Sequence, residues 1–295
     1  MLLVTLLLGA CSRAPVQTDV RQGRLEGYLD DQVEYYLGVP YAKPPVGELR
    51  WRPPMPVPAW AGTRKVKDNP SPCVQFSPVG GGLMGKEDCL YLNVWTPVQK
   101  PEAPMPVMVW IHGGGFIVGQ NSYFPDEGAR LAKGQNVVVV APNYRLGIFG
   151  FLAHETLTAE DPSHPSSGNY GIMDQTGALR WVRDNIAAFG GDPDNVTLFG
   201  QSAGGISVCA QLASPPARGL FHRAIIQSGP CVNPMASLEA VNDIGDVVVS
   251  ELGCRDAPDT LACMRGKDTE TVANTSPPDP TMGFAEGYTP VSYTH

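Results

Sequence analysis

The chain has 295 residues, of which 43% are hydrophobic and 17% are charged, and it contains five tryptophans, so it can bury a large core. Its formal net charge is −8 and no stripe of basic residues occurs, which argues against nucleic-acid binding. The composition therefore favours a folded domain without a nucleic-acid partner.

The chain begins with an apolar segment. Residues 1–10 are too few to span a bilayer and fit the apolar region of a signal peptide, although the usual basic residues before it are missing. Residues 8–11 resemble a bacterial lipobox, which predicts lipidation of Cys11 and membrane anchoring. Ordinary cleavage after Ala10 is the alternative. Both predict an exported protein, either a lipoprotein of the bacterial cell envelope or a secreted or periplasmic protein, with residues 11–22 as a tether.

The remaining chain, residues 23–295, reads as part of one α/β domain without repeats. Residues 23–37 are expected to form an antiparallel hairpin, and the proline-rich run 40–60 is expected to be extended and loop-like. Strands are expected near 90–96, 107–112, 137–143, 196–200 and 223–227. Helices are expected near 126–133, 174–188, 203–213 and 238–252.

Three successive glycines follow the predicted strand over 107–112. They stand in the sequence His-Gly-Gly-Gly-Phe at 112–116. Without Cβ atoms, such a loop can turn several backbone N–H groups toward one point. A phosphate-binding loop or a plain flexible turn is the alternative. No Lys-Ser/Thr follows for a P-loop, and the spacing of a dinucleotide fingerprint is absent.

A second glycine-containing motif lies at 200–204, where Gly-x-Ser-x-Gly joins the predicted strand 196–200 to the predicted helix 203–213. In this context it predicts a nucleophile elbow, with Ser202 on a turn too sharp for side chains two positions away. The positive end of the helix then faces any oxyanion formed there. We assign an oxyanion hole to the N–H groups of Gly114, Gly115 and Ala203.

Residues 189–205 resemble the serine signature of type-B carboxylesterases, the family that includes the cholinesterases, and residues 87–95 resemble its second signature. Further family segments match in the same order, at 38–47, 143–147, 171–175 and 220–229. The resemblance covers roughly residues 23 to 290. It implies an α/β-hydrolase fold with a mostly parallel central sheet flanked by helices, and a serine carboxylesterase activity.

The sequence offers no clear candidates for the acidic residue and the histidine that would complete a catalytic triad with Ser202. In α/β-hydrolases the triad runs Ser, Asp/Glu, His along the chain, so both partners must follow Ser202. Only His222 and His295 do, and no acidic residue lies between Ser202 and Glu239. The resemblance implies that His222 is structural, and His295 lies in no histidine motif. We expect the catalytic acid and base to be absent from this chain, and interpret it as the N-terminal portion of a longer esterase.

The resemblance also implies structural links. It pairs Cys73 with Cys89 and Cys254 with Cys263, and it leaves Cys209 as a small buried core residue and Cys231 without a partner. It implies a buried ion pair between Arg50 and Glu87 that positions the loop closed by Cys73 and Cys89. No cysteine or histidine spacing typical of a metal site occurs, and no cofactor is expected.

Two departures weigh against choline esters. Gln201 replaces the acidic residue that cholinesterases place before the nucleophile, and residues 74–88 contain no tryptophan to bind a quaternary ammonium. We expect a monomeric hydrolase that acts on a small-molecule ester through an acyl-enzyme on Ser202. A non-catalytic relative that acts by binding, or an inactive fragment of the esterase, is the alternative. Amide, thioester and carbamate substrates stay open.

Overall fold

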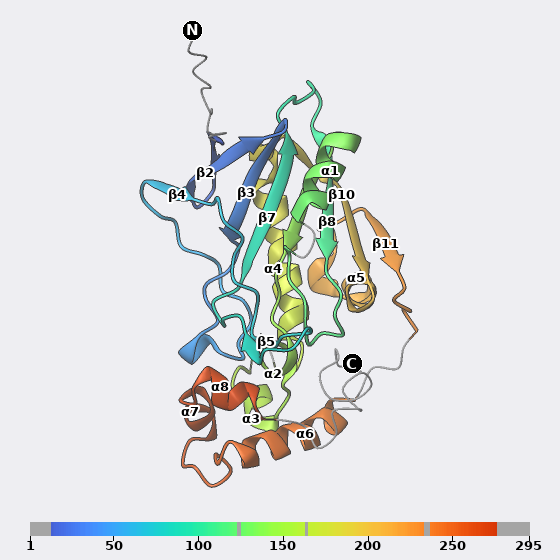
Figure 1. The fold of residues 1–295 in the computed structure, drawn as a ribbon. Coiled ribbons are helices and arrows are strands. Elements are labelled where there is room, and N and C mark those ends of the chain that lie inside the picture. Colours follow the sequence, from blue (N-terminus) through green and yellow to red (C-terminus); the bar gives the residue numbers. More distant parts are fainter. Residues whose placement is uncertain (1–12, 123–124, 163–164, 233–236, 276–295) are drawn as a thin grey trace.

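The computed structural model describes residues 13–122, 125–162, 165–232 and 237–275. Its centre is a nine-stranded sheet in the order β1-β2-β3-β7-β9-β8-β10-β11, with β4 beside β2 (Figure 1). The strands of this sheet are β1 Ala14–Val20, β2 Gly23–Asp30, β3 Val33–Pro40, β4 Thr63–Lys65, β7 Tyr91–Pro97, β8 Met105–Ile111, β9 Val138–Pro142, β10 Gly191–Gln201 and β11 Arg223–Gln227. A separate two-stranded sheet joins β5 Gln75–Phe76 to β6 Leu83–Met84.

The central sheet is mixed rather than mostly parallel, which corrects the expectation from sequence. Strands β1, β2, β3, β7 and β9 pair antiparallel in turn. Strands β9, β8, β10 and β11 pair parallel. The expected hairpin over 23–37 is present as β2 and β3. Within the antiparallel half, short turns join β1 to β2 and β2 to β3, whereas β3 and β7 are separated by residues 41–90. Each crossover in the parallel half also needs a longer connection.

Residues 14–20 do not form part of a tether as expected. They form β1, which pairs with β2 from Ala14 opposite Leu29 to Val20 opposite Gly23. The segment is polar, but Val16, Thr18 and Val20 alternate with more exposed residues, so one side of the strand packs toward the core. Residues 1–12, which include the predicted signal peptide and Cys11, lie outside the described part of the chain.

Helices cover both faces of the sheet. The α-helices are α1 Pro125–Gln135, α2 Gly147–Phe151, α3 Glu155–Ala159, α4 Tyr170–Asn185, α5 Ala203–Ala213, α6 Leu238–Glu251, α7 Thr260–Arg265 and α8 Thr269–Ala273. Three short 3₁₀ helices span Gly47–Leu49, Ile186–Phe189 and Pro215–Ala217. Helix α1 packs on β3, β7 and β9, and α4 and α5 pack on the opposite face. Helices α6, α7 and α8 gather below the sheet in the view of Figure 1.

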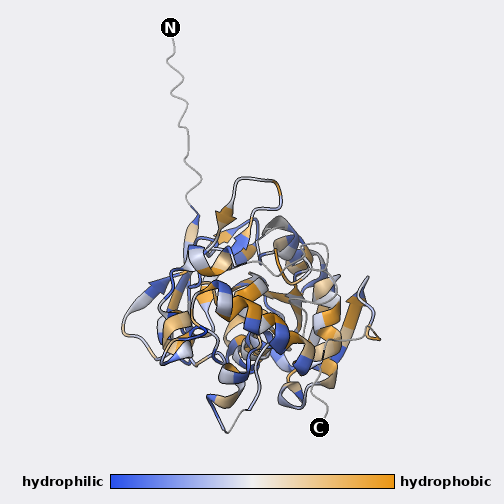
Figure 2. Cartoon of the chain, turned by 90° about the horizontal axis from the view of Figure 1, so that it is seen from below, coloured by the Kyte–Doolittle hydropathy of each residue, from blue (hydrophilic) through white to orange (hydrophobic). Residues whose placement is uncertain are grey.

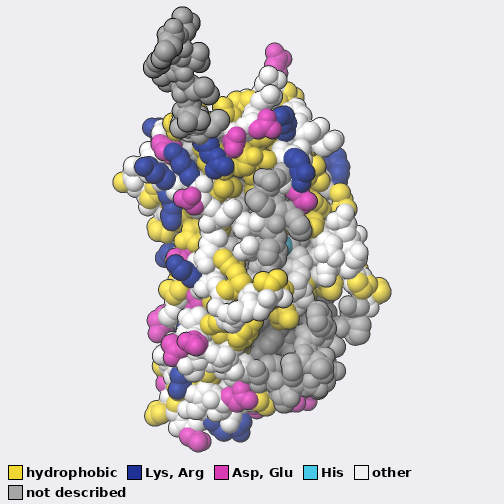
Figure 3. Space-filling model, viewed as in Figure 1, with side chains coloured by type: hydrophobic (Ala, Val, Ile, Leu, Met, Phe, Trp, Pro, Cys, Tyr) yellow, Lys and Arg dark blue, Asp and Glu magenta, His cyan; other side chains and the backbone are white. Residues whose placement is uncertain are grey.

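Two apolar cores follow from this arrangement. The smaller core lies under α1, where Ala129 and Ala132 meet Trp95 and Val139, and the larger core lies on the α4 and α5 face. Seen from below, the central strands are hydrophobic (Figure 2). On the face shown in Figure 3, basic and acidic side chains are interspersed and form no basic stripe. No helix within the described residues is long and apolar enough to cross a membrane.

The order of the parallel strands creates a crevice at one end of the sheet. The chain runs from β8 through α1 to β9 on one side of β8, and later places β10 on the other side. The segments that follow β8 and β10 therefore leave toward opposite faces of the sheet. Such a reversal of strand order opens a crevice at the carboxyl ends of the two strands, where ligands of α/β proteins bind. The glycine loop follows β8 and Ser202 follows β10.

Three disulfides link the described residues. Cys73–Cys89 and Cys254–Cys263 are the pairs implied by the family resemblance. The third, Cys209–Cys231, corrects the interpretation of Cys209 as an isolated core residue and of Cys231 as unpaired. It forms because α5 and the segment after β11 lie against each other at the carboxyl end of the sheet, which brings the two Cα atoms to 5.2 Å.

Candidate active site

Ser202 occupies a strained turn between β10 and α5. Its φ of 55° and ψ of −124° lie outside the regions that most residues adopt, a conformation that persists only where the surroundings enforce it. Its N–H donates to the carbonyl of Gln227 on β11 at 2.8 Å, and its carbonyl accepts from Ile206. The side chain is half-buried and stands at the carboxyl end of β10.

Gly200 and Gly204 must be glycines, because a Cβ at either position would clash with a neighbouring backbone carbonyl. A Cβ on Gly200 would lie 2.4 Å from the carbonyl oxygen of Gly204, so strand and helix nearly touch there. A Cβ on Gly204 would lie 2.1 Å from the carbonyl oxygen of Ile111, the last residue of β8. These are the steric reasons from which the sequence motif predicts a sharp turn.

The structure brings the glycine loop and the elbow together. The Cβ position of Gly113 lies 3.2 Å from the Cβ of Ser202. Gly114 and Gly115 have φ values of 110° and 60°, which place them in the left-handed region. Among the described residues no acceptor binds the N–H groups of Gly114, Gly115 or Ala203. These three N–H groups are therefore available to a ligand beside Ser202, as an oxyanion hole requires.

An apolar pocket of about 480 Å³ opens beside this point. It is lined by Gly113, Gly114 and Gln201 next to the elbow, and by side chains on the α1 face of the sheet, among them Trp95, Trp110, Leu131 and Phe199. The rings of Trp110 and Phe199 lie 4.9 Å apart on neighbouring strands. The sequence interpretation missed this pocket. Alternation along β8 was its only signal, since it places Trp110 on the face opposite Val109 and Ile111.

None of the described histidines hydrogen-bonds to Ser202. His222 directly precedes β11, and its Nδ1 accepts from the N–H of Val196 in the middle of β10 at 3.2 Å, so its role is structural. His154 begins α3, accepts from Thr156 N–H and reaches Asp246 at 3.0 Å. His295 lies outside the described residues. The described part of the chain thus brings Ser202 and backbone N–H donors together without a histidine beside the serine.

His112 is buried and neutral at physiological pH. Burial lowers the pKa of its imidazole to about 4, and the hydrogen bond with the carbonyl of Gly113 offsets only part of this effect. Between pH 6.5 and 4 the unfolded chain binds a proton at this position that the folded protein does not. The free energy of unfolding therefore falls as the pH falls through this range, by about 2–3 kcal/mol at pH 4.5 from His112 alone.

We expect this contribution to disappear in His112→Asn. Urea unfolding of the protein and of the variant at pH 7 and pH 4.5 gives the loss of stability in each. The variant should lose about 2–3 kcal/mol less than the protein over this range. An equal loss in both would show that His112 does not remain neutral on acidification.

Alanine at Gly114 or Gly115 is expected to lower kcat far more than it raises KM, because oxyanion donors act mainly in the transition state. One lost donor corresponds to about 10²–10³-fold in kcat. In Gly114→Ala the loop must also move, since the new Cβ would lie 2.0 Å from the carbonyl oxygen of Val118. The control is Gly219→Ala, which has a positive φ, open surroundings and a place at the amino end of β11. A change confined to KM would mean that the loop only shapes the pocket.

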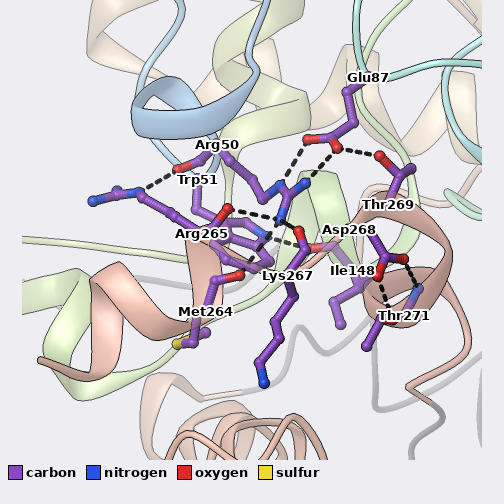
Figure 4. Close-up of polar contacts among 10 residues, drawn as sticks. All are labelled: Arg50, Trp51, Glu87, Ile148, Met264, Arg265, Lys267, Asp268, Thr269 and Thr271. Carbon is purple, nitrogen blue, oxygen red and sulfur yellow. Dashed lines mark hydrogen bonds and ion pairs between the residues drawn. The ribbon is translucent and has the colours of Figure 1, made fainter. Parts of the chain in front are cut away.

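Arg50 and Glu87 form a buried ion pair, with side chains 6% and 7% exposed (Figure 4). Arg50 Nε and Nη2 donate to the two carboxylate oxygens at 2.7 and 2.6 Å. Nη1 donates to carbonyls where α7 ends, those of Met264, Arg265 and Lys267. Thr269, at the start of α8, donates to Glu87. The pair thus joins the loop closed by Cys73–Cys89 to both helices, which sequence reasoning did not foresee.

A serine on a strand-to-helix elbow, beside a glycine loop at the reversal of a mixed sheet, is the arrangement of the α/β-hydrolase fold. The family model described as "Carboxylesterase family" matches residues 14–291, and the chain belongs to this family.

Several relatives are similar over most of the chain. Fumonisin B1 esterase of Sphingopyxis macrogoltabida is 45% identical over 246 residues, which are 79% of this chain and 45% of that protein. Cocaine esterase of Homo sapiens is 39% identical over 285 residues, 90% of this chain and 49% of that protein. Both are named as ester-hydrolysing enzymes.

Solved structures agree with these relatives. A PNB esterase superposes with a TM-score of 0.80 at 39% identity and covers 90% of this chain and 53% of that one. The carboxylesterase EST55 of Geobacillus stearothermophilus, solved at pH 6.2, superposes with a TM-score of 0.82 at 39% identity over 93% of this chain and 55% of that one. The chain spans about half the length of the relatives that it matches.

Proposed function

We propose that the whole protein is a serine carboxylesterase. The Oγ of Ser202 attacks the carbonyl carbon of an ester, and the N–H groups of Gly114, Gly115 and Ala203 stabilise the tetrahedral oxyanion. Collapse of this intermediate releases the alcohol and leaves an acyl group on Ser202, which water then removes as the carboxylic acid. The observation that carries the proposal is the close approach of the Gly113 backbone to Ser202, where a Cβ on Gly113 would lie 3.2 Å from that of Ser202.

We propose further that the acid and base come from parts of the protein outside this chain. A serine hydroxyl is a weak nucleophile without a base, and no histidine among the described residues reaches Ser202. Among the described residues no strand pairs with the outer side of β11, whose Ile225 and Ile226 are 43% and 37% exposed. An apolar sheet edge of this kind can pair with a further strand. Both observations support a second portion of the protein that completes the site.

The substrate class follows from the pocket. Aromatic and aliphatic side chains such as Trp110, Leu131 and Phe199 line its α1 side, and His112, Gln201 and Gln227 line its end near the elbow. Such a pocket suits an ester with an apolar acyl or alcohol group and a polar carbonyl end. The two relatives named above are called after different esters, fumonisin B1 and cocaine, so relatedness supports ester hydrolysis as a class rather than one substrate.

The test is hydrolysis together with labelling. The whole protein is expected to hydrolyse p-nitrophenyl esters of short acids and to take up one fluorophosphonate label, located by peptide mapping on Ser202. Residues 12–295 alone should show little of this activity. The absence of both hydrolysis and label in the whole protein would favour the non-catalytic binding alternative. Full activity of the short chain would show that it carries its own base.

We also propose that the protein is exported, with Cys11 lipidated. The three disulfides support this, because disulfides persist in oxidising compartments. Labelled palmitate fed to expressing bacteria should appear in the protein and should be lost in Cys11→Ser. Equal incorporation in both proteins, or none in either, would contradict the assignment of Cys11.

A further inference from the structure

His112 opens the glycine loop, and its ring binds the loop itself. Nδ1 of His112 lies 2.9 Å from the carbonyl oxygen of Gly113. A carbonyl oxygen can only accept a hydrogen bond, so Nδ1 carries the hydrogen and Nε2 is the unprotonated nitrogen. Nε2 is buried and has no hydrogen-bond partner within the described residues. A second proton there would have no acceptor, which agrees with a neutral ring.

The bonded carbonyl belongs to the same peptide unit as an oxyanion donor. The C=O of Gly113 and the N–H of Gly114 are the two ends of one planar peptide group, and in a trans peptide they point in opposite directions. No cis peptide occurs in the described residues. A group that fixes the direction of the Gly113 carbonyl therefore fixes the direction of the Gly114 N–H.

The two sides of this loop face different neighbours. The carbonyl oxygen of Gly113 and Nδ1 of His112 both face Gly119, whose Cβ position lies 2.6 and 2.2 Å from them. The Cβ position of Gly113 faces Ser202 instead. Since glycine peptides rotate more freely than others, the loop requires an external contact to hold one orientation.

The ring of His112 is itself held rigidly. It stacks on Tyr144 with ring centroids 4.3 Å apart, and the Tyr144 hydroxyl donates to the backbone carbonyl of His112 at 2.9 Å. Behind the ring, the side chain of Gln75 exchanges two hydrogen bonds with the backbone of Gly119, at 2.8 and 2.9 Å. His112, Tyr144 and Gln75 are all buried.

We infer that His112 is a positioning residue of the oxyanion hole: it holds the Gly113–Gly114 peptide so that the Gly114 N–H points toward the oxyanion beside Ser202. This inference rests on the proposed esterase function. It assigns no proton transfer to His112, which also lines the pocket beside the elbow.

The test compares two substitutions in the whole protein. His112→Leu replaces the ring with an apolar side chain that cannot donate a hydrogen bond. His112→Asn keeps an N–H donor at the position of Nδ1. His112→Leu should lower kcat by about 10- to 100-fold and change KM by less than about threefold, because a misdirected donor is lost mainly in the transition state. His112→Asn should recover most of kcat. Affinity for a boronic acid that mimics the tetrahedral intermediate should fall in parallel with kcat. His222→Asn, which changes a histidine bonded to the backbone of Val196 in β10, is the control.

Several outcomes would overturn the inference. Equal losses in the two His112 variants would mean that the ring acts by packing alone, and a loss confined to KM would mean a role in substrate binding. If the unsubstituted protein neither hydrolyses esters nor takes the label, the proposed function fails instead. Crystal structures of the protein and of His112→Leu then still decide on His112, since an unchanged Gly113–Gly114 peptide in the variant would refute the inference and a rotated one would support it.

Discussion

Replacing Ser202 with alanine is expected to lower kcat for p-nitrophenyl esters by about 10⁴- to 10⁶-fold in the whole protein. The hydroxyl is the atom that forms the acyl-enzyme, and no other side chain stands on the elbow between β10 and α5. Oxyanion donors and substrate binding remain in the variant, so a residual rate of about 10³–10⁴ over water is expected. Initial rates and mass spectrometry of the labelled protein measure both effects.

Ser214→Ala is the matched control for this change. Ser214 ends the same helix α5 that Ser202 begins, and it is expected to leave kcat within about twofold because it lies outside the site. The uptake of one fluorophosphonate should be lost in Ser202→Ala and kept in Ser214→Ala. Near-normal turnover by Ser202→Ala would contradict the assignment of Ser202 as the nucleophile and, with it, the proposed mechanism.

Replacing Arg50 with methionine is expected to lower the free energy of unfolding by about 3–5 kcal/mol. The variant leaves the buried carboxylate of Glu87 without its cation and the carbonyls at the end of α7 without their donor. Unpaired buried charge is the larger of the two costs. Urea unfolding followed by tryptophan fluorescence measures the change, provided that the transition is reversible.

Arg52→Met is the control for the loss of one arginine. Its side chain is 42% exposed and pairs with Glu160 at 2.7 Å, so it should cost less than about 1 kcal/mol. The double variant Arg50→Met with Glu87→Met should recover part of the loss, since no buried charge is left, but the α7 carbonyls stay unsatisfied. If Arg50→Met and Arg52→Met lower the free energy of unfolding by similar amounts, burial of the Arg50–Glu87 pair does not determine its contribution to stability.

The elbow and the glycine loop could be predicted from sequence because their chemistry requires glycine at fixed spacing. Gly204 and Gly114 have no room for a Cβ, and such positions leave a signature in any one sequence. The parallel strands were also predictable, since buried β-branched runs such as β9 stand out from their surroundings. Which strands pair with one another, and in which direction, cannot be read from such runs, so the mixed character of the sheet was missed.

Other features depend on contacts between distant residues. The Cys209–Cys231 bond depends on how α5 meets the segment after β11, and seven cysteines allow many pairings. Helices α7 and α8 have six and five residues, too few for a helical pattern to emerge. The role of His112 depends on Tyr144 and Gly119, which only the fold brings to its ring.

The ion pair described above also constrains the order of folding. Arg50 and Glu87 are 37 residues apart in the chain, whereas the α7 carbonyls that Arg50 binds are 214 to 217 residues away. At roughly 5–20 residues per second, a ribosome needs roughly 10–40 s to make the intervening segment. The guanidinium and the carboxylate can therefore meet long before α7 exists, and we expect α7 and α8 to dock onto a pair that is already formed. Until α7 docks, Nη1 of Arg50 lacks the carbonyl acceptors that it has in the folded protein.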